Sequence, residues 1–332
     1  MIRTAIGVCA LGVLLSGCAA AYDDDGELLV GGTLVAAPAP AASRVPVVID
    51  SDLAPDDLAA IAYLVRHPAV EVLAITVPDT GMVTCSGGID LLADLFGALD
   101  AEPVPVACGE TSRGEHGVPF PADWTGASLA LSGLDRSTGG AMPPLPRIDA
   151  ASYLARLASR VDGLQVVALG PLTDIAEMMR THPAAYGRLA GIISMAGIVD
   201  TESHDADLGV GEWNAAADVD AFAAVLGGPL PVTLVPDDPV PDGRPAGLAA
   251  PVVSPLGMAP EFTTPAFWDL ATAGAFTTPA AVRVETGTWT VDLERDRGRL
   301  ERTGDGPVRV VTGLDTVLLD EAYAAVFGTD LR

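Results

Sequence analysis

Four aspartates, Asp50, Asp52, Asp56 and Asp57, lie within one eight-residue stretch near the start of the main apolar part of the chain. Carboxylates crowded together in this way must be neutralised by a cation or must hold protons. The stretch contains no cysteine or histidine, and oxygen ligands alone favour Ca²⁺ or Mg²⁺ over Zn²⁺. These residue types therefore predict a site for a hard divalent cation.

The elements on either side position the acids at the end of a strand. Residues 45–49 are β-branched except for Pro46, which is typical of a buried parallel strand. Pro55 indicates a helix start, and it is followed by apolar residues at helical spacing: Leu58, Ile61, Ala62 and Val65. Ligands of open α/β sheets bind at the carboxyl ends of strands, so we expect the acids to line a ligand site.

Other interpretations of the acid cluster explain less of it. Asp56 and Asp57 could cap the helix while Asp50 and Asp52 stay solvated, but capping uses one or two acids and not four. The Gly and the terminal Glu of an EF-hand loop are missing. A phosphatase of the haloacid dehalogenase type also begins with Asp-x-Asp after a strand. That type would have Thr or Val where this chain has Ala54.

The stretch Asp50-Ser-Asp52-Leu-Ala-Pro-Asp56-Asp57 resembles the Asp-x-Asp-x-Gly-x-Asp-Asp signature of the nucleoside hydrolases. The resemblance implies calcium-dependent hydrolysis of the N-glycosidic bond of a ribonucleoside, giving free base and ribose. It implies that Asp52 binds calcium and serves as general base, that Asp57 binds calcium, and that Asp56 binds ribose hydroxyls. Asp50 would orient the loop.

Four further segments extend this resemblance. Residues 167–174 resemble a family strand end at which a carbonyl before Gly, here that of Leu169, binds calcium. Phe267-Trp268-Asp269 resembles the segment in which the last calcium ligand, here Asp269, follows an aromatic residue or His. Met195-Ala-Gly197 and Gly211-Glu-Trp-Asn214 resemble the segments that bind the sugar hydroxyls.

Glu212 and Asn214 would therefore contact the sugar, and together they offer the donors and acceptors that a neutral polyol requires. Without the family, a helix cap at Asn214 preceded by a surface glutamate explains the same two residues about as well.

The aromatic residues of this chain resemble those of the purine-specific, inosine-adenosine-guanosine-preferring branch. Trp268 replaces the His that many nucleoside hydrolases have as a candidate leaving-group acid. Trp124, in the segment 119–124, matches a loop tryptophan that stacks on the base, and Trp213 and Asp79 match further substrate contacts. The resemblance implies a purine held between Trp124 and Trp268.

Some positions depart from the family pattern. Ala54 replaces the signature glycine, and Asp174 replaces a usual asparagine. The segment 200–207 has no counterpart of the asparagine that binds on the 5′ side of the ribose, and the Pro-rich segment 236–265 is shorter than expected for the helical region over the site. A second function therefore stays open, that of a binding lipoprotein which keeps the metal pocket without turnover.

The N-terminus has the pattern of a bacterial lipoprotein. A short positive start and a brief apolar run, too short to span a bilayer, indicate an export signal. Leu15-Ser-Gly-Cys18 matches the lipobox, so we expect a signal peptide over 1–18 and a lipid on Cys18; ordinary cleavage after residues 19–21 is the alternative. Residues 19–43 have the composition of a flexible tether to a domain over 44–332. The pattern predicts an exported protein, lipid-anchored to the cell envelope.

The remaining chain predicts one α/β domain with a doubly wound, mostly parallel central sheet flanked by helices, and a small C-terminal β extension. Strand patterns alternate with helical ones at 70–77, 104–107, 165–169, 191–195 and 231–235. Further strands are expected at 282–293 and 307–311, followed by a closing helix at 315–327.

Charge and cysteine content narrow the class of protein further. A net charge of -26 argues against nucleic acid and against a phosphorylated substrate, and it favours a neutral small molecule. Cys85 and Cys108 are the two cysteines of the expected domain, and their spacing is compatible with a disulfide or with buried thiols. The sequence leaves the choice between a monomer and a homo-oligomer open.

Overall fold

The computed structural model describes residues 44–131, 140–248 and 266–328, together with three short strands before them. These are β1 (Ala21–Tyr22), β2 (Leu28–Val30) and β3 (Thr33–Leu34), which pair antiparallel in that order. The predicted signal peptide with Cys18, and most of the predicted tether, lie outside the described residues. Lipidation and the tether therefore stay predictions.

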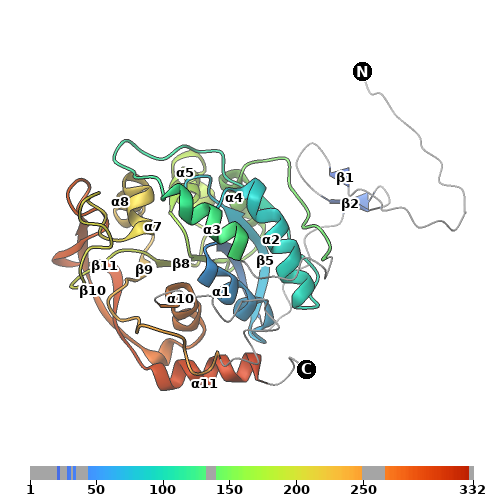
Figure 1. Cartoon of the computed structure of the whole chain (residues 1–332). Coiled ribbons are helices and arrows are strands. Elements are labelled where there is room, and N and C mark those ends of the chain that lie inside the picture. The colour runs from blue at the N-terminus through green and yellow to red at the C-terminus, as the bar shows by residue number, and fades with distance from the viewer. Residues whose placement is uncertain are drawn as a thin grey trace, which may run out of the picture.

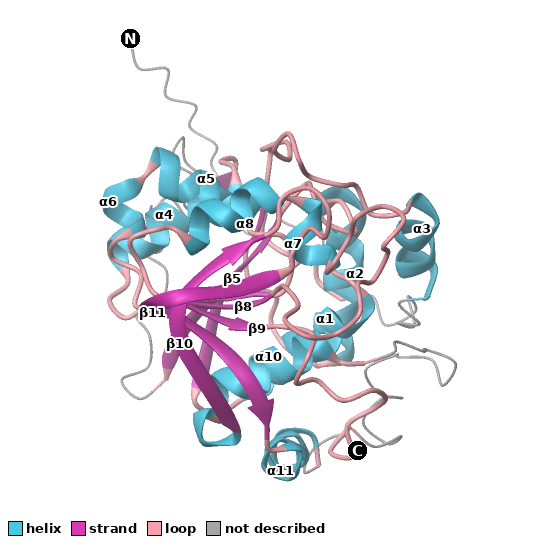
Figure 2. Cartoon of the chain, turned by 90° about the vertical axis from the view of Figure 1, so that its left-hand side faces the viewer, coloured by secondary structure: helices cyan, strands magenta, loops and turns pink. Residues whose placement is uncertain are grey.

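The centre of the domain is an eight-stranded sheet with the strand order β10-β11-β9-β8-β7-β4-β5-β6 (Figures 1 and 2). Its strands are β4 (Val45–Asp50), β5 (Val70–Val77), β6 (Val106–Cys108), β7 (Gln165–Ala168), β8 (Gly191–Met195), β9 (Val232–Val235), β10 (Val282–Val291) and β11 (Leu300–Leu314). Neighbouring strands are parallel except for the β10–β11 pair. The predicted doubly wound, mostly parallel sheet is confirmed.

The C-terminal extension is a hairpin whose second strand joins the central sheet. Arg309 and Val310 of β11 pair in parallel with β9. The strand predicted at 307–311 corresponds only to the part of β11 that pairs with β9, whereas the observed strand begins at Leu300. The earlier part, with Glu301 and Arg302, is polar and has no apolar strand pattern; it is a strand because it pairs with β10.

The sheet has its switch point between β4 and β7. From β4 the chain first builds β5 and β6 on one side, and then returns to build β7, β8 and β9 on the other. Asp50 at the end of β4 is in register with Ala168 at the end of β7. The acid stretch and Leu169 thus leave the sheet side by side, at the position where open α/β sheets bind ligands.

Helices cover both faces of the sheet (Figure 2). On one face the core cluster includes residues of α1 (Pro55–Arg66), α2 (Cys85–Ala98), α10 (Trp268–Thr277) and α11 (Thr316–Phe327). On the other it includes residues of α4 (Ala150–Arg160), α5 (Thr173–Thr181), α6 (Pro183–Tyr186) and α8 (Val219–Leu226). Val47 and Ile49 belong to the first cluster and Val48 to the second, because successive strand side chains point to opposite faces.

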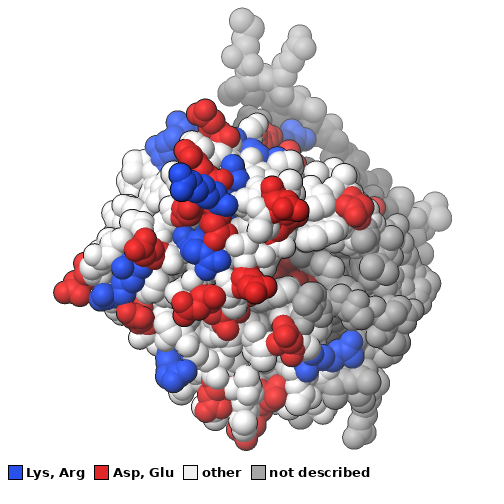
Figure 3. Space-filling model, turned by 60° about the vertical axis from the view of Figure 1, so that its left-hand side comes forward, with Lys and Arg blue, Asp and Glu red and all other residues white. Residues whose placement is uncertain are grey.

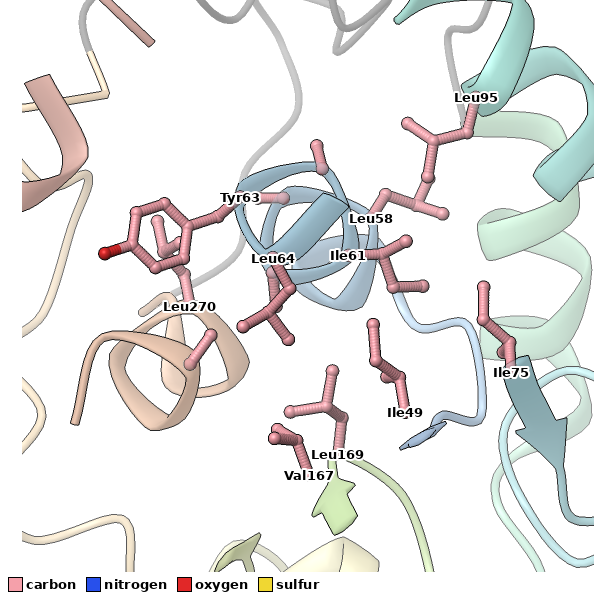
Figure 4. Packing of buried hydrophobic residues seen from close by; sticks show 14 of the residues in the cluster. Ile49, Leu58, Ile61, Tyr63, Leu64, Ile75, Leu95, Val167, Leu169 and Leu270 are labelled. Atoms are coloured by element: carbon pink, nitrogen blue, oxygen red, sulfur yellow. The ribbon is translucent and has the colours of Figure 1, made fainter. Parts of the chain in front are cut away.

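Helix α1 fixes the acid stretch to the sheet. Its residues Ile61 and Leu64 point toward Ile49, Val167 and Leu169 of the central strands (Figure 4). Each fully buried side chain of this size contributes about 1.5–3 kcal/mol. The first turn of α1, which contains two of the aspartates, is therefore firmly placed above the switch point.

Cys85 and Cys108 form a disulfide with a Cα–Cα distance of 5.5 Å. It joins the first residue of α2 to the last residue of β6. Of the two alternatives that the sequence left open, a disulfide or buried thiols, the structure contains the disulfide. The remaining connectors are α3 (Ala122–Leu131), which packs on α2, and α7 (Trp213–Ala217), which packs on α8.

The described surface shown in Figure 3 is mixed in charge. On this face arginine side chains lie among acidic ones instead of forming a patch of their own. In the described part of the chain, no helix combines the length and the apolar character that crossing a membrane requires.

Candidate active site

A cavity of about 570 Å³ opens at the carboxyl ends of the central strands. Cavities of this size suit small-molecule ligands. Most of the predicted site residues line it: Asp52, Asp56, Trp124, Leu169, Glu212, Trp213, Asn214, Trp268 and Asp269. Asp57 is fully buried beneath this lining, and Asp79 is exposed and does not belong to it. The fold thus brings together the sites predicted from separate segments, with Asp79 as the exception.

The loop between β4 and α1 is held by its own polar groups. Ser51 Oγ donates to Asp57 Oδ1 and accepts from the backbone N–H of Leu53. Met82 N–H donates to Asp52 Oδ2 at 2.8 Å. Leu53 has a φ of 59°, a left-handed conformation that is uncommon for a branched side chain and that recurs at functional sites. The loop is therefore fixed in one conformation, with Asp52 and Asp56 in the cavity lining.

Close packing around Asp52 requires glycine at position 170. A Cβ atom there would lie 2.9 Å from the Asp52 Cβ. The Gly-Pro that follows β7 is common after strands in general, but in this chain it has a specific task. It lets β7 end directly against the acid loop.

Asp56, Asp57 and Asp269 form a compact cluster of buried acids, with one oxygen of each within 4.8 Å of the others. Asp57 Oδ2, Asp269 Oδ1 and Asp52 Oδ1 have no hydrogen-bond partner among the described residues. Buried oxygens without partners are costly, and a hard cation would satisfy them. The cluster differs from the predicted ligand set, because it contains Asp56, which was expected to bind ribose, and does not contain Asp52.

Burial also changes the acidity of these groups. It raises the pKa of Asp52 to about 7, with the neighbouring Asp56 and Glu212 charges adding to the effect. The pKa values of Asp57 and Asp269 are raised well above the ordinary value, first by burial and then by neighbouring carboxylates. Each carboxylate thus resists ionisation until a positive charge arrives, which is the behaviour expected of a cation site.

The predicted calcium carbonyl of Leu169 lies in the cavity lining and accepts a hydrogen bond of 2.7 Å from Asn214 Nδ2. A carbonyl oxygen has a second lone pair, so this bond is compatible with a further ligand. Asn214 therefore orients the carbonyl as well as facing the cavity.

Glu212 is buried, with 2% of its surface exposed, and it caps helix α7. Its carboxylate accepts from the N–H groups of Asn214, Ala215 and Gly197 at 2.7, 2.9 and 2.8 Å. The alternative of an Asn cap preceded by a surface glutamate is therefore wrong, since the glutamate is the cap. Its side chain links the end of β8 to α7 at the cavity wall.

Asp50 lies below the cavity and does not line it. Thr76 Oγ1 donates to its Oδ1 at 2.5 Å, and burial raises its pKa to about 7. Asp174, at the position of the family asparagine, is also fully buried, and its pKa is raised by burial and by the nearby Asp50 charge. Both acids support the floor of the site from beneath.

The tryptophans fall into two groups. Trp213 stacks on Phe120 with ring centroids 5.4 Å apart, and Trp124 meets Trp213 edge-on at 5.2 Å. Trp268 begins α10 and contacts the ring of His204 at 6.0 Å instead. Trp124 keeps 40% of its surface exposed, which leaves an aromatic face at the cavity for a planar ligand.

Sequence reasoning missed His204 and Asp237, which both line the cavity. His204 Nε2 lies 3.3 Å from Asp237 Oδ1. Burial alone would lower the pKa of His204, but the Asp237 hydrogen bond and the charges of Glu212 and Asp237 outweigh it, so the pKa is raised. Asp237 follows directly after strand β9, so the strand-end rule that pointed to Asp50 and Asp52 could have found it.

A family model described as inosine-uridine preferring nucleoside hydrolase matches residues 47–319 of this chain. The chain belongs to this family. The matched range includes every predicted site residue except Cys18, and it covers both the acid cluster and the hairpin that completes the sheet.

Individual relatives agree with the family assignment. The pyrimidine-specific ribonucleoside hydrolase RihA of Escherichia fergusonii is 27% identical over 184 residues, which are 53% of this chain and 53% of that protein. The match thus spans about half the length of the curated relatives.

Two solved structures share the fold. The inosine-uridine preferring nucleoside hydrolase from Bacillus anthracis has a TM-score of 0.72 at 20% identity, covering 85% of this chain and 98% of that one. The purine-preferring ribonucleoside hydrolase from Gardnerella vaginalis has a TM-score of 0.65 at 20% identity, covering 85% and 98%. The doubly wound architecture of this chain is therefore that of the nucleoside hydrolases.

Proposed function

We propose that this protein hydrolyses the N-glycosidic bond of ribonucleosides, with calcium as its cofactor and purine nucleosides as its preferred substrates. The observation that supports the proposal most strongly is the buried acid cluster at the switch point of a nucleoside hydrolase fold. Among the described residues, Asp57 Oδ2 and Asp269 Oδ1 within the cluster and Asp52 Oδ1 beside it have no hydrogen-bond partner, and a hard cation bound there would satisfy all three.

The residues divide the reaction between them. Asp57 and Asp269 hold the cation together with Asp52 and the Leu169 carbonyl, and calcium, when bound, supplies charge neutralisation and acidifies a water molecule. Asp52 accepts the proton of the attacking water as the C1′–N bond breaks. Asp56 and Asn214 bind ribose hydroxyls, and Glu212 fixes the wall behind them.

The preference for purines is supported by the tryptophans. Trp124 and Trp268 both line the cavity, and an indole stacked on a base contributes about 1–3 kcal/mol. A purine presents a larger face than a pyrimidine. Among the relatives, the Gardnerella vaginalis enzyme is described as purine-preferring and the RihA proteins as pyrimidine-specific, so substrate choice must be measured.

The decisive experiment incubates the purified domain with inosine and with uridine and measures free ribose. We expect inosine to be cleaved faster, and we expect cleavage to stop on chelation and to return with added Ca²⁺. Binding of inosine without release of ribose would support the second function, a binding lipoprotein that retains the pocket.

We further propose that the chain is exported and lipid-anchored through Cys18. The disulfide between Cys85 and Cys108 supports export, because such bonds persist in oxidising compartments. Cys18→Ser should release the protein from the membrane fraction or leave its signal uncleaved, as seen by fractionation and intact mass. An unchanged membrane fraction would refute the anchor.

A further inference from the structure

Among the described residues that line the cavity, His204 is the one basic side chain. The ionisable groups that share the lining with it are all acids: Asp52, Asp56, Glu212, Asp237, Asp242 and Asp269. A base that leaves a ribose takes the bonding electron pair with it, so it needs a proton or another way to stabilise that charge. Asp52 and Asp269, which would hold the cation, are ionised when it is bound and have no proton to give, whereas a protonated His204 is a cationic acid that can give one.

The position of His204 suits this task. Its ring centroid lies 6.0 Å from that of Trp268, with the planes tilted by 45°. Under the proposed function Trp268 stacks on the base, so the imidazole stands beside the place where the base leaves. Trp268 stands directly before Asp269 in this chain, and the imidazole comes from the loop between β8 and α7.

That loop is fixed. The backbone N–H of His204 donates to the carbonyl of Gly211 at 2.9 Å, and Ser203 Oγ donates to Asp296 Oδ1 at 2.7 Å. Arg299 donates to the carbonyls of Val199 and Thr201 at 2.8 and 2.9 Å. A loop tied at both ends to the β10–β11 hairpin can hold a side chain in one place, as a proton donor requires.

The charges around His204 favour its protonated form. Asp237, after β9, pairs with Nε2, and the buried Glu212 at the start of α7 adds a second negative charge. Asp242 lines the same cavity. Asp237 Oδ1 lies 3.3 Å from Nε2, and an aspartate beside one imidazole nitrogen is a common way to orient the other.

We propose that His204, oriented by Asp237, gives a proton to the departing purine. The inference rests on the proposed nucleoside hydrolysis. The C1′–N bond breaks, and its electron pair passes to the base, which takes the proton of the imidazolium. The oxygen of water bonds to C1′, and one water proton passes to the Asp52 carboxylate. Solvent then returns a proton to the neutral imidazole and takes up the proton held by Asp52.

The test compares two leaving groups in the wild type and in His204→Gln. Inosine needs a proton on its base, whereas 4-nitrophenyl β-D-ribofuranoside releases a stable phenolate without one. We expect His204→Gln to lower kcat on inosine about 100-fold, the size expected of general acid catalysis, and to leave the nitrophenyl riboside nearly unchanged. His116→Gln is the matched control, because His116 also pairs with an aspartate, at 2.8 Å, but lies outside the cavity lining.

A pH profile adds an independent readout. With inosine the wild-type rate should fall as pH rises through the pKa of His204, and this limb should be absent in His204→Gln. Asp237→Asn should move the limb to lower pH, because it removes the charge that stabilises the imidazolium. The limb should be absent with the nitrophenyl riboside.

The outcomes separate this inference from the proposed function. Equal losses on both substrates would overturn it and assign His204 to sugar binding, and unchanged rates on both would give it no role. A wild type that cleaves neither substrate would instead refute the proposed hydrolysis.

Discussion

The two ends of the cavity are built in different ways. At the acid end, Asp52, Asp56 and Asp57 come from one short loop, Asp269 comes from the start of α10, and all four are buried. At the aromatic end, Trp124 lies in α3, Trp213 and Trp268 begin α7 and α10, and His204 comes from the loop between β8 and α7; Trp124 is 40% exposed.

Under the proposed function, the acid end carries out the hydrolysis and the aromatic end selects the base. The acid end is a set of buried carboxylates, and those of its oxygens that lack a partner among the described residues suit a hard cation. The aromatic end offers the partly exposed ring of Trp124, the ring of Trp268 and the His204–Asp237 ion pair. We therefore expect substitutions at the acid end to abolish the reaction, and substitutions at the aromatic end to alter which base is accepted and how fast it leaves.

The largest effect should come from Asp52→Asn at the acid end. An amide still offers an oxygen to a cation but cannot accept a proton from water, so turnover should fall about 100- to 10,000-fold. Inosine binding, followed by calorimetry, should be nearly retained. Asp162→Asn is the control, because this side chain is 99% exposed and lies far from the lining. More than about a tenth of the wild-type rate in Asp52→Asn would assign the base role to another group.

A smaller effect should follow from Trp268→Ala at the aromatic end. Loss of a stacking face worth about 1–3 kcal/mol should lower the rate on inosine by about one to two powers of ten. Trp268→Phe, which keeps a smaller face, should fall between the two, and calcium affinity should be unchanged in both. Uridine cleaved as fast as inosine by the wild type would contradict the proposed purine preference.

The same contrast explains what the sequence could and could not predict. Asp52, Asp56 and Asp57 of the acid end were predictable because they are close in the chain and follow a strand directly, so local pattern determines their place. Asp269 lies far along the chain, in α10, and was predicted from the family resemblance. The parallel sheet was predictable for a similar reason, since buried strands have continuous apolar runs.

The aromatic end was only partly predictable. His204 and Asp237 are separated by helices α7 and α8 and strand β9, and they meet through the fold alone. The polar half of β11 likewise has no apolar pattern, because its hydrogen bonds to β10, and not burial, make it a strand. Asp79 resembles a family position, yet its side chain is exposed outside the cavity.

Calcium should stabilise the fold measurably, and Asp57→Ala should remove this effect. A ligand that binds the folded state alone adds about 4 kcal/mol at a thousandfold excess over its Kd. We therefore expect the Tm of the wild type to rise with Ca²⁺ and fall on chelation, as followed by calorimetry. Trp268→Ala should keep the calcium response, which makes it the matched control. A wild-type Tm that changes neither with calcium nor with chelator would refute the metal site.

The smallest effect concerns pH, and it tests whether burial alone keeps the acid end protonated. Burial raises the pKa of Asp52 to about 7 and that of Asp56 to about 6, both above the ordinary value of 3.8. Between the ordinary and the raised pKa the folded state binds more protons than the unfolded state, so the free energy of unfolding decreases as pH rises through this window. The metal-free protein should thus have a higher Tm at pH 5.5 than at pH 7.5.

Calcium needs ionised ligands, so the increase in Tm that it causes should be larger at pH 7.5. Melting curves at both pH values, with calcium and with chelator, measure the two effects together. A metal-free Tm that falls on acidification would show that these carboxylates are ionised without a cation, and the acid end would then need a different source of positive charge.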